Sequence, residues 1–193
     1  MEGLVIIVAS IFTANIALTN FLGMCPFIAI SKDYHSAMGM GAAVTFVLTI
    51  TSMVNWIINN YILVPFGVEY LQFVVFIIVI ASLVQIVEMF VERVSPTLYN
   101  ALGIFLPLIT VNCAILGVSL FMILRNYNFI KAVSYGFGGG LGWSLAIISM
   151  ASIRNRLQYA DIPRQLQGPG ITMITAGLMA LGFIGFTGIV NIQ

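Results

Sequence analysis

The sequence predicts an all-α integral membrane protein with six transmembrane helices, arranged as an inverted 3+3 repeat in which helices 1 and 4 are broken. The first observation behind this prediction is composition: 61% of the 193 residues are apolar, 7% are charged, and the mean hydropathy is +1.10. Soluble domains carry roughly 25% charged residues. The second observation is the presence of six long apolar runs, and the third is that proline, glycine and cysteine interrupt two of them. Residues 1–193 are therefore expected to form a single membrane domain.

Six segments have the length that a span requires, which is about 20 apolar residues across roughly 30 Å of hydrocarbon. The expected spans lie at about 4–30, 37–59, 70–91, 98–124, 130–152 and 170–190. The connections between them are short, so no soluble domain is expected. The chain starts with MEGLVIIVASIF, which carries an acid and no Lys or Arg, unlike the basic start of a signal peptide. We therefore expect the first apolar run to remain in the mature protein.

The basic residues of the short loops predict the orientation of the spans, because cytoplasmic loops carry an excess of Lys and Arg. One group follows the first, third and fifth segments: Lys32, Arg93, Arg154, Arg156 and Arg164. The other side, which holds both termini, has only Arg125 and Lys131. Both termini are thus expected on the outer side of a bacterial cytoplasmic (inner) membrane. The net charge of +1 and the lack of a basic face exclude nucleic acid as a partner.

The chain divides into two halves of three segments, approximately 1–95 and 96–193, and each half follows the same plan. The first segment of each half is interrupted, by Gly23, Cys25 and Pro26 in one and by Pro107, Cys113 and Gly117 in the other. The second segment of each half starts glycine-rich, with GMGAA at 39–43 and YGFGGGLGW at 135–143. Three spans are an odd number, so the second half enters the membrane with opposite orientation. An inverted repeat of this kind places its functional site where broken helices meet near the midplane.

Each interruption creates backbone groups that lack helical partners, since proline removes a hydrogen bond and clashes with the preceding turn. Such backbone at membrane depth must be buried in protein or line a cavity. Polar side chains cluster at the same places: Asn15, Thr19 and Asn20 in one half, Thr110 and Asn112 in the other. We expect their amides and hydroxyls to satisfy the freed backbone groups. The glycine-rich stretch 135–143 lacks the preceding strand of a nucleotide-binding loop and is expected to serve close helix packing.

The two cysteines, Cys25 and Cys113, are the candidate ligands of the chain. On straight helices their depths in the membrane would differ by roughly 15 Å, whereas helices that break would bring both sulfurs to one level. Free cysteine is often a small buried hydrophobe, so packing is one interpretation. The other is a soft, sulfur-only metal site, which suits Zn, Cu(I) or iron–sulfur. Two thiolates form only half of such a site, and a 2Fe-2S cluster held by four cysteine thiolates is one way to complete it.

Four stretches of the chain resemble a known family: NFLGMCPFIAISK (20–32), YNALGIFLPLITVNCAILG (99–117), YGFGGGLGWSLA (135–146) and ITAGLMALGF (174–183). They are similar to the RnfA/NqrE family, membrane subunits of the Rnf complex and of the sodium-pumping NADH:quinone oxidoreductase. The proline in GMCPF resembles the RnfA branch. ITVNCAI and the loop RNYNF (125–129) are at least as similar to the sodium-pump subunit.

The resemblance implies an electron-carrying subunit without a complete active site of its own. Cys25 and Cys113 match the cluster-binding positions of the family. Together with two cysteines of a homologous partner (RnfE or NqrD type), inserted the opposite way round, they would hold one intramembrane 2Fe-2S cluster. Single electrons would pass across the bilayer between cytoplasmic iron–sulfur or flavin subunits and a flavin carrier outside. In the Rnf complex the reaction would join reduced ferredoxin and NAD, coupled to sodium or proton movement.

Glu88 is the one carboxylate well inside an expected span, where an ionised acid costs roughly 2.5–3.5 kcal/mol. It is a candidate for ion coupling, unless it reaches the cytoplasmic interface near Arg93. Two other functions also remain open: a small inverted-repeat secondary transporter and a purely structural membrane subunit. The cysteine pair separates them from electron transfer, because a transporter needs no thiolates and a structural subunit needs no broken helices.

Overall fold

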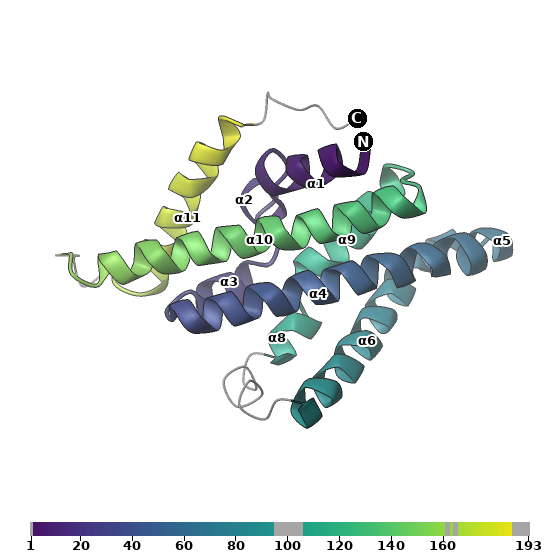
Figure 1. Ribbon diagram of the computed structural model, residues 1–193, viewed down its shortest axis with the longest axis horizontal. Coiled ribbons are helices and arrows are strands. Elements are labelled where there is room, and N and C mark those ends of the chain that lie inside the picture. The colour runs from purple at the N-terminus through teal and green to yellow at the C-terminus, as the bar shows by residue number, and fades with distance from the viewer. Residues whose placement is uncertain (1, 95–105, 161–162, 164–165, 187–193) are drawn as a thin grey trace.

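The computed structural model describes residues 2–94, 106–160, 163 and 166–186 (Figure 1), and these residues form helices and connecting turns without a strand. Four helical stretches are long and apolar enough to cross a membrane: Tyr34–Phe66, Glu69–Phe90, Pro107–Leu124 and Phe129–Leu157. Two apolar helices are shorter, Gly3–Phe12 and Pro169–Ile184. The predicted all-α fold with several apolar helices is thus confirmed. Parts of two predicted spans (98–105 and 187–190), the division at 95/96 and Arg164 lie outside the described residues.

The first predicted span, 4–30, forms three short helices instead of one rod. They are α1 (Glu2–Phe12), α2 (Ile16–Thr19) and α3 (Met24–Ile30). Between α2 and α3 the backbone turns through two residues with positive φ, Phe21 (52°) and Gly23 (78°). The described part of the span 98–124 also breaks, into α8 (Leu106–Thr110) and α9 (Cys113–Leu124). Both segments that the sequence predicts to be interrupted are therefore broken.

The helical stretches at 34–66, 72–94 and 129–157 extend beyond the apolar runs that predicted them, whereas the last helix ends within its predicted span. α4 (Tyr34–Ile58) continues through a π-helical turn, Asn59–Leu63, into α5 (Val64–Phe66); a 3-10 turn, Glu69–Leu71, then leads into α6 (Gln72–Val94). α10 spans Phe129–Leu157 and α11 spans Pro169–Ile184. The last turn of α10 carries Arg154 and Arg156, which we expected in a loop. Hydropathy marks only the hydrocarbon-depth part of a helix, and backbone hydrogen bonds continue past it.

α4 and α10 lie side by side through the middle of the molecule, with α1 against α10 and α6 against α4 (Figure 1). Glycines of α10 make this packing close. A Cβ atom added at Gly140 would lie 2.6 Å from the Cα of Thr45 on α4, and one at Gly138 would lie 2.9 Å from the Cα of Ile7 on α1. Small residues let helix backbones approach in this way. The prediction of close helix packing by residues 135–143 is thus confirmed.

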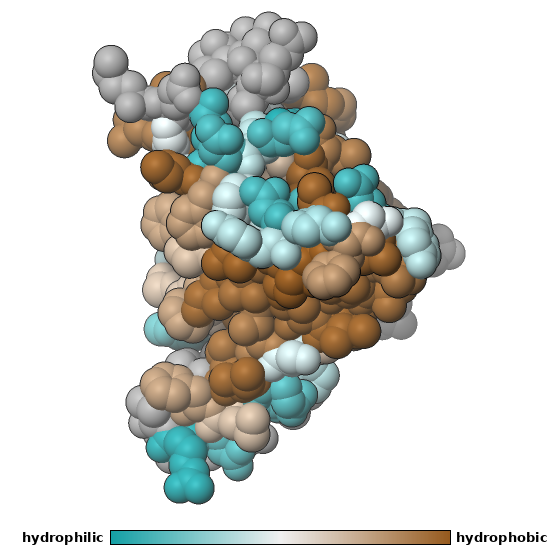
Figure 2. Space-filling model, turned by 90° about the vertical axis from the view of Figure 1, so that its right-hand side faces the viewer, coloured by the Kyte–Doolittle hydropathy of each residue, from teal (hydrophilic) through white to brown (hydrophobic). Residues whose placement is uncertain are grey.

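The surface carries many large apolar side chains, as a lipid-embedded protein requires. Phe66, Tyr70 and Leu4 are 75%, 79% and 72% exposed, and only 17% of the most apolar stretch of α6 is buried. Figure 2 shows a broad hydrophobic surface on one side of the molecule, with hydrophilic residues gathered in separate patches. The largest fully buried side chain is Trp143 of α10, which lies close to the broken helices.

Candidate functional site

Two asparagines begin helices that follow breaks, one after the break between α1 and α2 and one after the break between α8 and α9. Asn15 is the N-cap of α2, and its Oδ1 accepts a hydrogen bond from the Ala17 backbone N (3.1 Å). Asn112 is the N-cap of α9, and its Oδ1 accepts from the Ala114 backbone N (3.0 Å). An N-cap side chain supplies an acceptor for a backbone N–H that the helix itself cannot pair. Both asparagines thus act as the sequence predicts.

Asn15 also connects the break between α1 and α2 to α10 by a hydrogen bond. Its Nδ2 donates to the carbonyl oxygens of Ile11 (3.1 Å) and Gly142 (2.8 Å). Thr19 Oγ1 donates in turn to the Asn15 carbonyl oxygen (2.6 Å). Asn15 is fully buried, so these bonds pair carbonyl groups that water does not reach. The break between α1 and α2 is therefore fixed by hydrogen bonds to α1 and to α10.

The cysteines lie at the starts of two helices, each directly after a break. Cys25 is the second residue of α3, and Cys113 is the first residue of α9. The backbone N of Gly23, two residues before Cys25, donates a hydrogen bond to Cys113 Sγ (2.9 Å). Residues 90 positions apart in the sequence are thus in direct contact. Both thiols are exposed on the surface of the chain.

Gly23 is packed so closely that only glycine fits. Its φ of 78° is in the left-handed region, and an added Cβ would lie 2.6 Å from Trp143 Nε1 and 2.8 Å from Asn112 Oδ1. The sequence marks Gly23 as a helix breaker and gives no sign of these neighbours, because the contacts join three separate segments. Trp143 Nε1 and Asn112 Nδ2 are buried and have no hydrogen-bond partner among the described residues.

A cavity of about 220 Å³ lies beside Cys113, between α6 and the break that separates α8 from α9. Its walls are mainly apolar, and they are formed by Ile77, Ile80, Thr110, Val111, Asn112, Cys113 and Leu116. The Cys113 thiol therefore lies at a cavity whose walls offer few polar groups. We call Cys25 and Cys113 together the thiol half-site.

The thiol half-site supplies two ligands and no more. Within the described residues there is no group of three or more His, Cys, Asp or Glu side chains that could hold a metal ion. Iron–sulfur clusters of the 2Fe-2S type take four cysteine thiolates. Exposure of both sulfurs leaves them accessible to a second chain, and the Gly23 N–H is a donor of the kind that stabilises a negatively charged sulfur. The residues present fit half of such a cluster.

Glu88 lies apart from the thiol half-site in the sequence and on a different helix. It is half-buried on α6, and its Oε2 accepts a hydrogen bond from Gln85 Nε2 (3.3 Å). Arg93 lies in the last turn of the same helix, which ends at Val94. Both interpretations of Glu88, ion coupling and contact with the membrane interface, therefore remain predictions.

These features define a helical membrane protein in which two interrupted segments meet, each with an exposed cysteine beside its break. Residues 4–190 match the family described as "Rnf-Nqr subunit, membrane protein". The chain belongs to this family, as its motifs predict.

Curated relatives match the chain from end to end. The proteins of Aliivibrio salmonicida and Vibrio cholerae are each 51% identical to it over 191 residues, and in both cases the match covers 99% of this chain and 99% of the relative. A third, from Pseudoalteromonas atlantica, is 51% identical over 190 residues and covers 98% of each chain. All three are named as the A-type subunit of an ion-translocating oxidoreductase complex. These names favour the RnfA branch of the resemblance.

Proposed function

We propose that the chain is a membrane subunit of an ion-translocating oxidoreductase complex of the Rnf type. In this proposal Cys25 and Cys113 provide two of the four thiolates of an intramembrane 2Fe-2S cluster. A homologous subunit of the RnfE type provides the other two. The cluster, when bound, accepts and releases one electron at a time. The overall reaction is electron transfer between reduced ferredoxin and NAD, coupled to the movement of sodium or protons.

The observation that carries this proposal is the hydrogen bond from the Gly23 backbone N to Cys113 Sγ (2.9 Å). It joins the two cysteine-bearing breaks, although the cysteines are far apart in the sequence. Two thiols that served packing alone would be buried, whereas both are exposed. A secondary transporter or a purely structural subunit would have no use for exposed thiols at this point. The geometry therefore favours a metal ligand pair that a second chain completes.

The residues around the thiol half-site would hold it in shape for electron transfer. Asn112 fixes the first turn of α9, which carries Cys113, and Gly23 allows α3 to start against Trp143. A rigid ligand set moves little between oxidised and reduced states. The mainly apolar walls of the cavity beside Cys113 would keep water away from the sulfur once the second chain covers the exposed thiol. Exclusion of water and the N–H···S bond both act on the reduction potential of a sulfur-ligated centre.

The proposal includes an inverted repeat of two three-helix halves. Asn15 and Asn112, the two asparagines that cap helices after breaks, are 97 positions apart, and so are Gly39 and Gly136 in the glycine-rich starts. Close approaches pair Gly41 with Ser144 and Gly140 with Thr45, so α4 and α10 run antiparallel. Both facts support two halves of opposite orientation.

We further propose that the chain lies in the bacterial cytoplasmic membrane with both termini outside. Its partners there would be the homologous subunit and the flavin-bearing and iron–sulfur subunits of the complex. Lys32, Arg154 and Arg156 lie at one end of the helix bundle, and the excess of basic residues there supports a cytoplasmic position. Reaction of single introduced cysteines with an impermeant reagent in intact cells would test this orientation.

The cluster is tested by co-expressing the chain with its homologous partner and purifying the complex. Iron, acid-labile sulfide and the low-temperature EPR spectrum of the reduced complex are measured. We expect a 2Fe-2S signal that is lost in Cys25→Ser and in Cys113→Ser. The control is Ser119→Ala, a buried change on the same helix as Cys113, which should keep the signal. A fully assembled complex without iron would contradict the proposal and favour transport or a structural function.

A further inference from the structure

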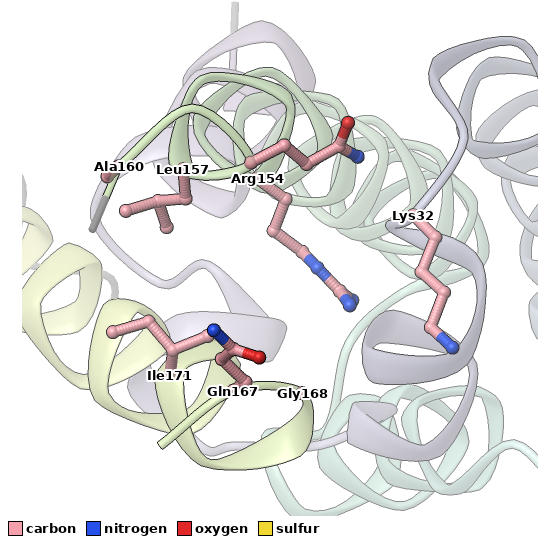
Figure 3. Close-up of a pocket in the computed structure, with 8 residues that line it drawn as sticks. Lys32, Arg154, Leu157, Ala160, Gln167, Gly168 and Ile171 are labelled. Carbon is pink, nitrogen blue, oxygen red and sulfur yellow. The ribbon is translucent and has the colours of Figure 1, made fainter. Parts of the chain in front are cut away.

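A second cavity, separate from the thiol half-site, lies between the end of α10, the start of α11 and the turn that joins α3 to α4 (Figure 3). Its volume is about 390 Å³, which lies within the usual range for small-molecule sites. The lining residues are Lys32, Arg154, Leu157, Gln158, Ala160, Gln167, Gly168 and Ile171. Two of these are cations and none is an acid, so the cavity suits a negatively charged group.

The guanidinium of Arg154 is held in place at this cavity. Its Nη1 donates to the Ile28 carbonyl oxygen (2.9 Å) and to Ser31 Oγ (2.8 Å). These bonds leave Nε and Nη2 for a ligand, and Figure 3 shows the side chain reaching from α10 into the space toward Lys32. Arg154 is half-buried, and its position is fixed before anything binds. A pre-positioned donor binds an anion at lower entropic cost than a mobile one.

Lys32 approaches the same space from the opposite side, on the turn between α3 and α4 (Figure 3). Within the described residues it has no hydrogen-bond or ion-pair partner. Gly168, directly before the first residue of α11, completes the polar side, and the start of a helix carries partial positive charge. Two cations from separate elements thus line one cavity, and none of its described lining residues is a carboxylate.

The cavity also has an aliphatic part, and it lies at the ends of helices that are long and apolar enough to cross a membrane. Leu157 and Ile171 form its apolar part. Leu157 ends the membrane-spanning helix α10, while Lys32 lies just before the span that starts at Tyr34. Cations beside aliphatic side chains at the end of several spans are the arrangement that binds lipid headgroups.

We propose that this cavity binds the phosphate group of an anionic membrane lipid between Arg154 and Lys32. A bound lipid would join α10, α11 and the α3–α4 turn through one ligand. α3 carries Cys25, so the lipid would also stabilise the segment on which half of the thiol pair depends. Arg154 already bonds to Ile28 and Ser31 at the end of that helix.

The test uses the purified complex in detergent and adds phosphatidylglycerol, phosphatidylcholine or inorganic phosphate. The thermal unfolding midpoint and the number of bound lipids by native mass spectrometry are measured. We expect phosphatidylglycerol to raise the midpoint and phosphatidylcholine to leave it nearly unchanged. Lys32→Gln should weaken the apparent affinity for phosphatidylglycerol about fivefold, the effect of one cation near a membrane surface. The matched control is Arg156→Gln, an exposed cation of the same helix end that does not line the cavity.

Three results would overturn the proposal. The first is an equal response to both lipids, and the second is an unchanged response to phosphatidylglycerol in Lys32→Gln and in Arg154→Gln. The third is a carbodiimide cross-link between Lys32 and a partner subunit's carboxylate, which would assign the cations to an ion pair between proteins. Protection by inorganic phosphate equal to that by phosphatidylglycerol, and lost in Lys32→Gln, would keep the phosphate site and replace the lipid by a soluble anion.

Discussion

Gly23→Ala gives the sharpest test of how the thiol half-site is built. The added Cβ would lie 2.6 Å from Trp143 Nε1, and Trp143 is fully buried and cannot move aside. Overpacking of this kind costs about 1–3 kcal/mol. The backbone φ of 78° adds roughly 1–2 kcal/mol for a residue with a Cβ. Gly23→Ala should therefore destabilise the protein by about 2–5 kcal/mol.

The matched control is Gly67→Ala, because Gly67 also has a positive φ (65°) but an added Cβ there would meet nothing within 4 Å. Gly67→Ala carries the conformational cost alone, so the difference between the two variants isolates the packing around the cysteines. A chain of this size loses about 2–4 °C per kcal/mol, so Gly23→Ala should unfold about 2–12 °C below Gly67→Ala.

The assay is thermal unfolding of the purified complex, followed by iron content in the fraction that stays folded. We expect Gly23→Ala to lose iron while Gly67→Ala retains it, because the Cβ added at Gly23 would push the turn away from Trp143 and move the backbone N–H of residue 23 away from Cys113 Sγ. Equal midpoints and equal iron content in the two variants would show that Gly23 is merely a turn residue, and the reasoning above would be refuted.

Three further predictions concern other parts of the fold. Asn15→Ala should cost about 1–3 kcal/mol for each buried backbone group left unpaired, seen as a lower unfolding midpoint; an unchanged midpoint would contradict the role of Asn15 in the first break. Hydrogen bonds from the Ser36 Oγ and N hold the pKa of Asp33 below its usual value of 3.8. The ionised Asp33 carboxylate therefore stabilises α4 fully above pH ~3.8, and this stabilisation is lost as the pH falls through the lower pKa of the folded state. Wild type and Asp33→Ala should differ in unfolding midpoint at pH 7 and converge only below pH ~3.8. Glu88→Gln should lower ion uptake by vesicles before it affects assembly of the complex, and normal uptake would remove Glu88 from the coupling candidates.

The sequence predicts the positions of the apolar helices, of the break at Gly23 and of the break before Cys113, because hydropathy and helix-breaking residues are local properties. It does not predict the additional break between α1 and α2. It also predicts that Asn15 and Asn112 pair freed backbone groups, since an asparagine beside a break has few other uses at membrane depth. Helix ends are predicted less well, as Arg154 shows: it belongs to α10 although it lies beyond the apolar run. Hydropathy cannot detect a polar helical turn outside the hydrocarbon.

Contacts between distant segments could not be predicted from the sequence. The approach of Gly23 to Trp143 and the cavity between Arg154 and Lys32 both depend on how three elements meet. A glycine beside a cysteine and proline indicates a break and says nothing of the aromatic ring against it. A loop lysine indicates a cytoplasmic side and says nothing of an arginine that faces it across a cavity.

The two cysteines occupy different positions relative to the asparagine caps, and this difference bears on the half-site. Cys113 directly follows the cap Asn112, whereas Cys25 lies ten residues after the corresponding cap, Asn15. The offset between the caps is 97 residues and that between the cysteines is 88, so the thiols are not equivalent in the proposed repeat. The first segment has a second break, at Gly23, and this break meets the start of α9. The extra break at Gly23, more than the repeat itself, brings the start of α3, the helix that carries Cys25, to Cys113. We therefore expect a change that restores a continuous helix across 20–23 to separate the thiols even where both caps remain intact.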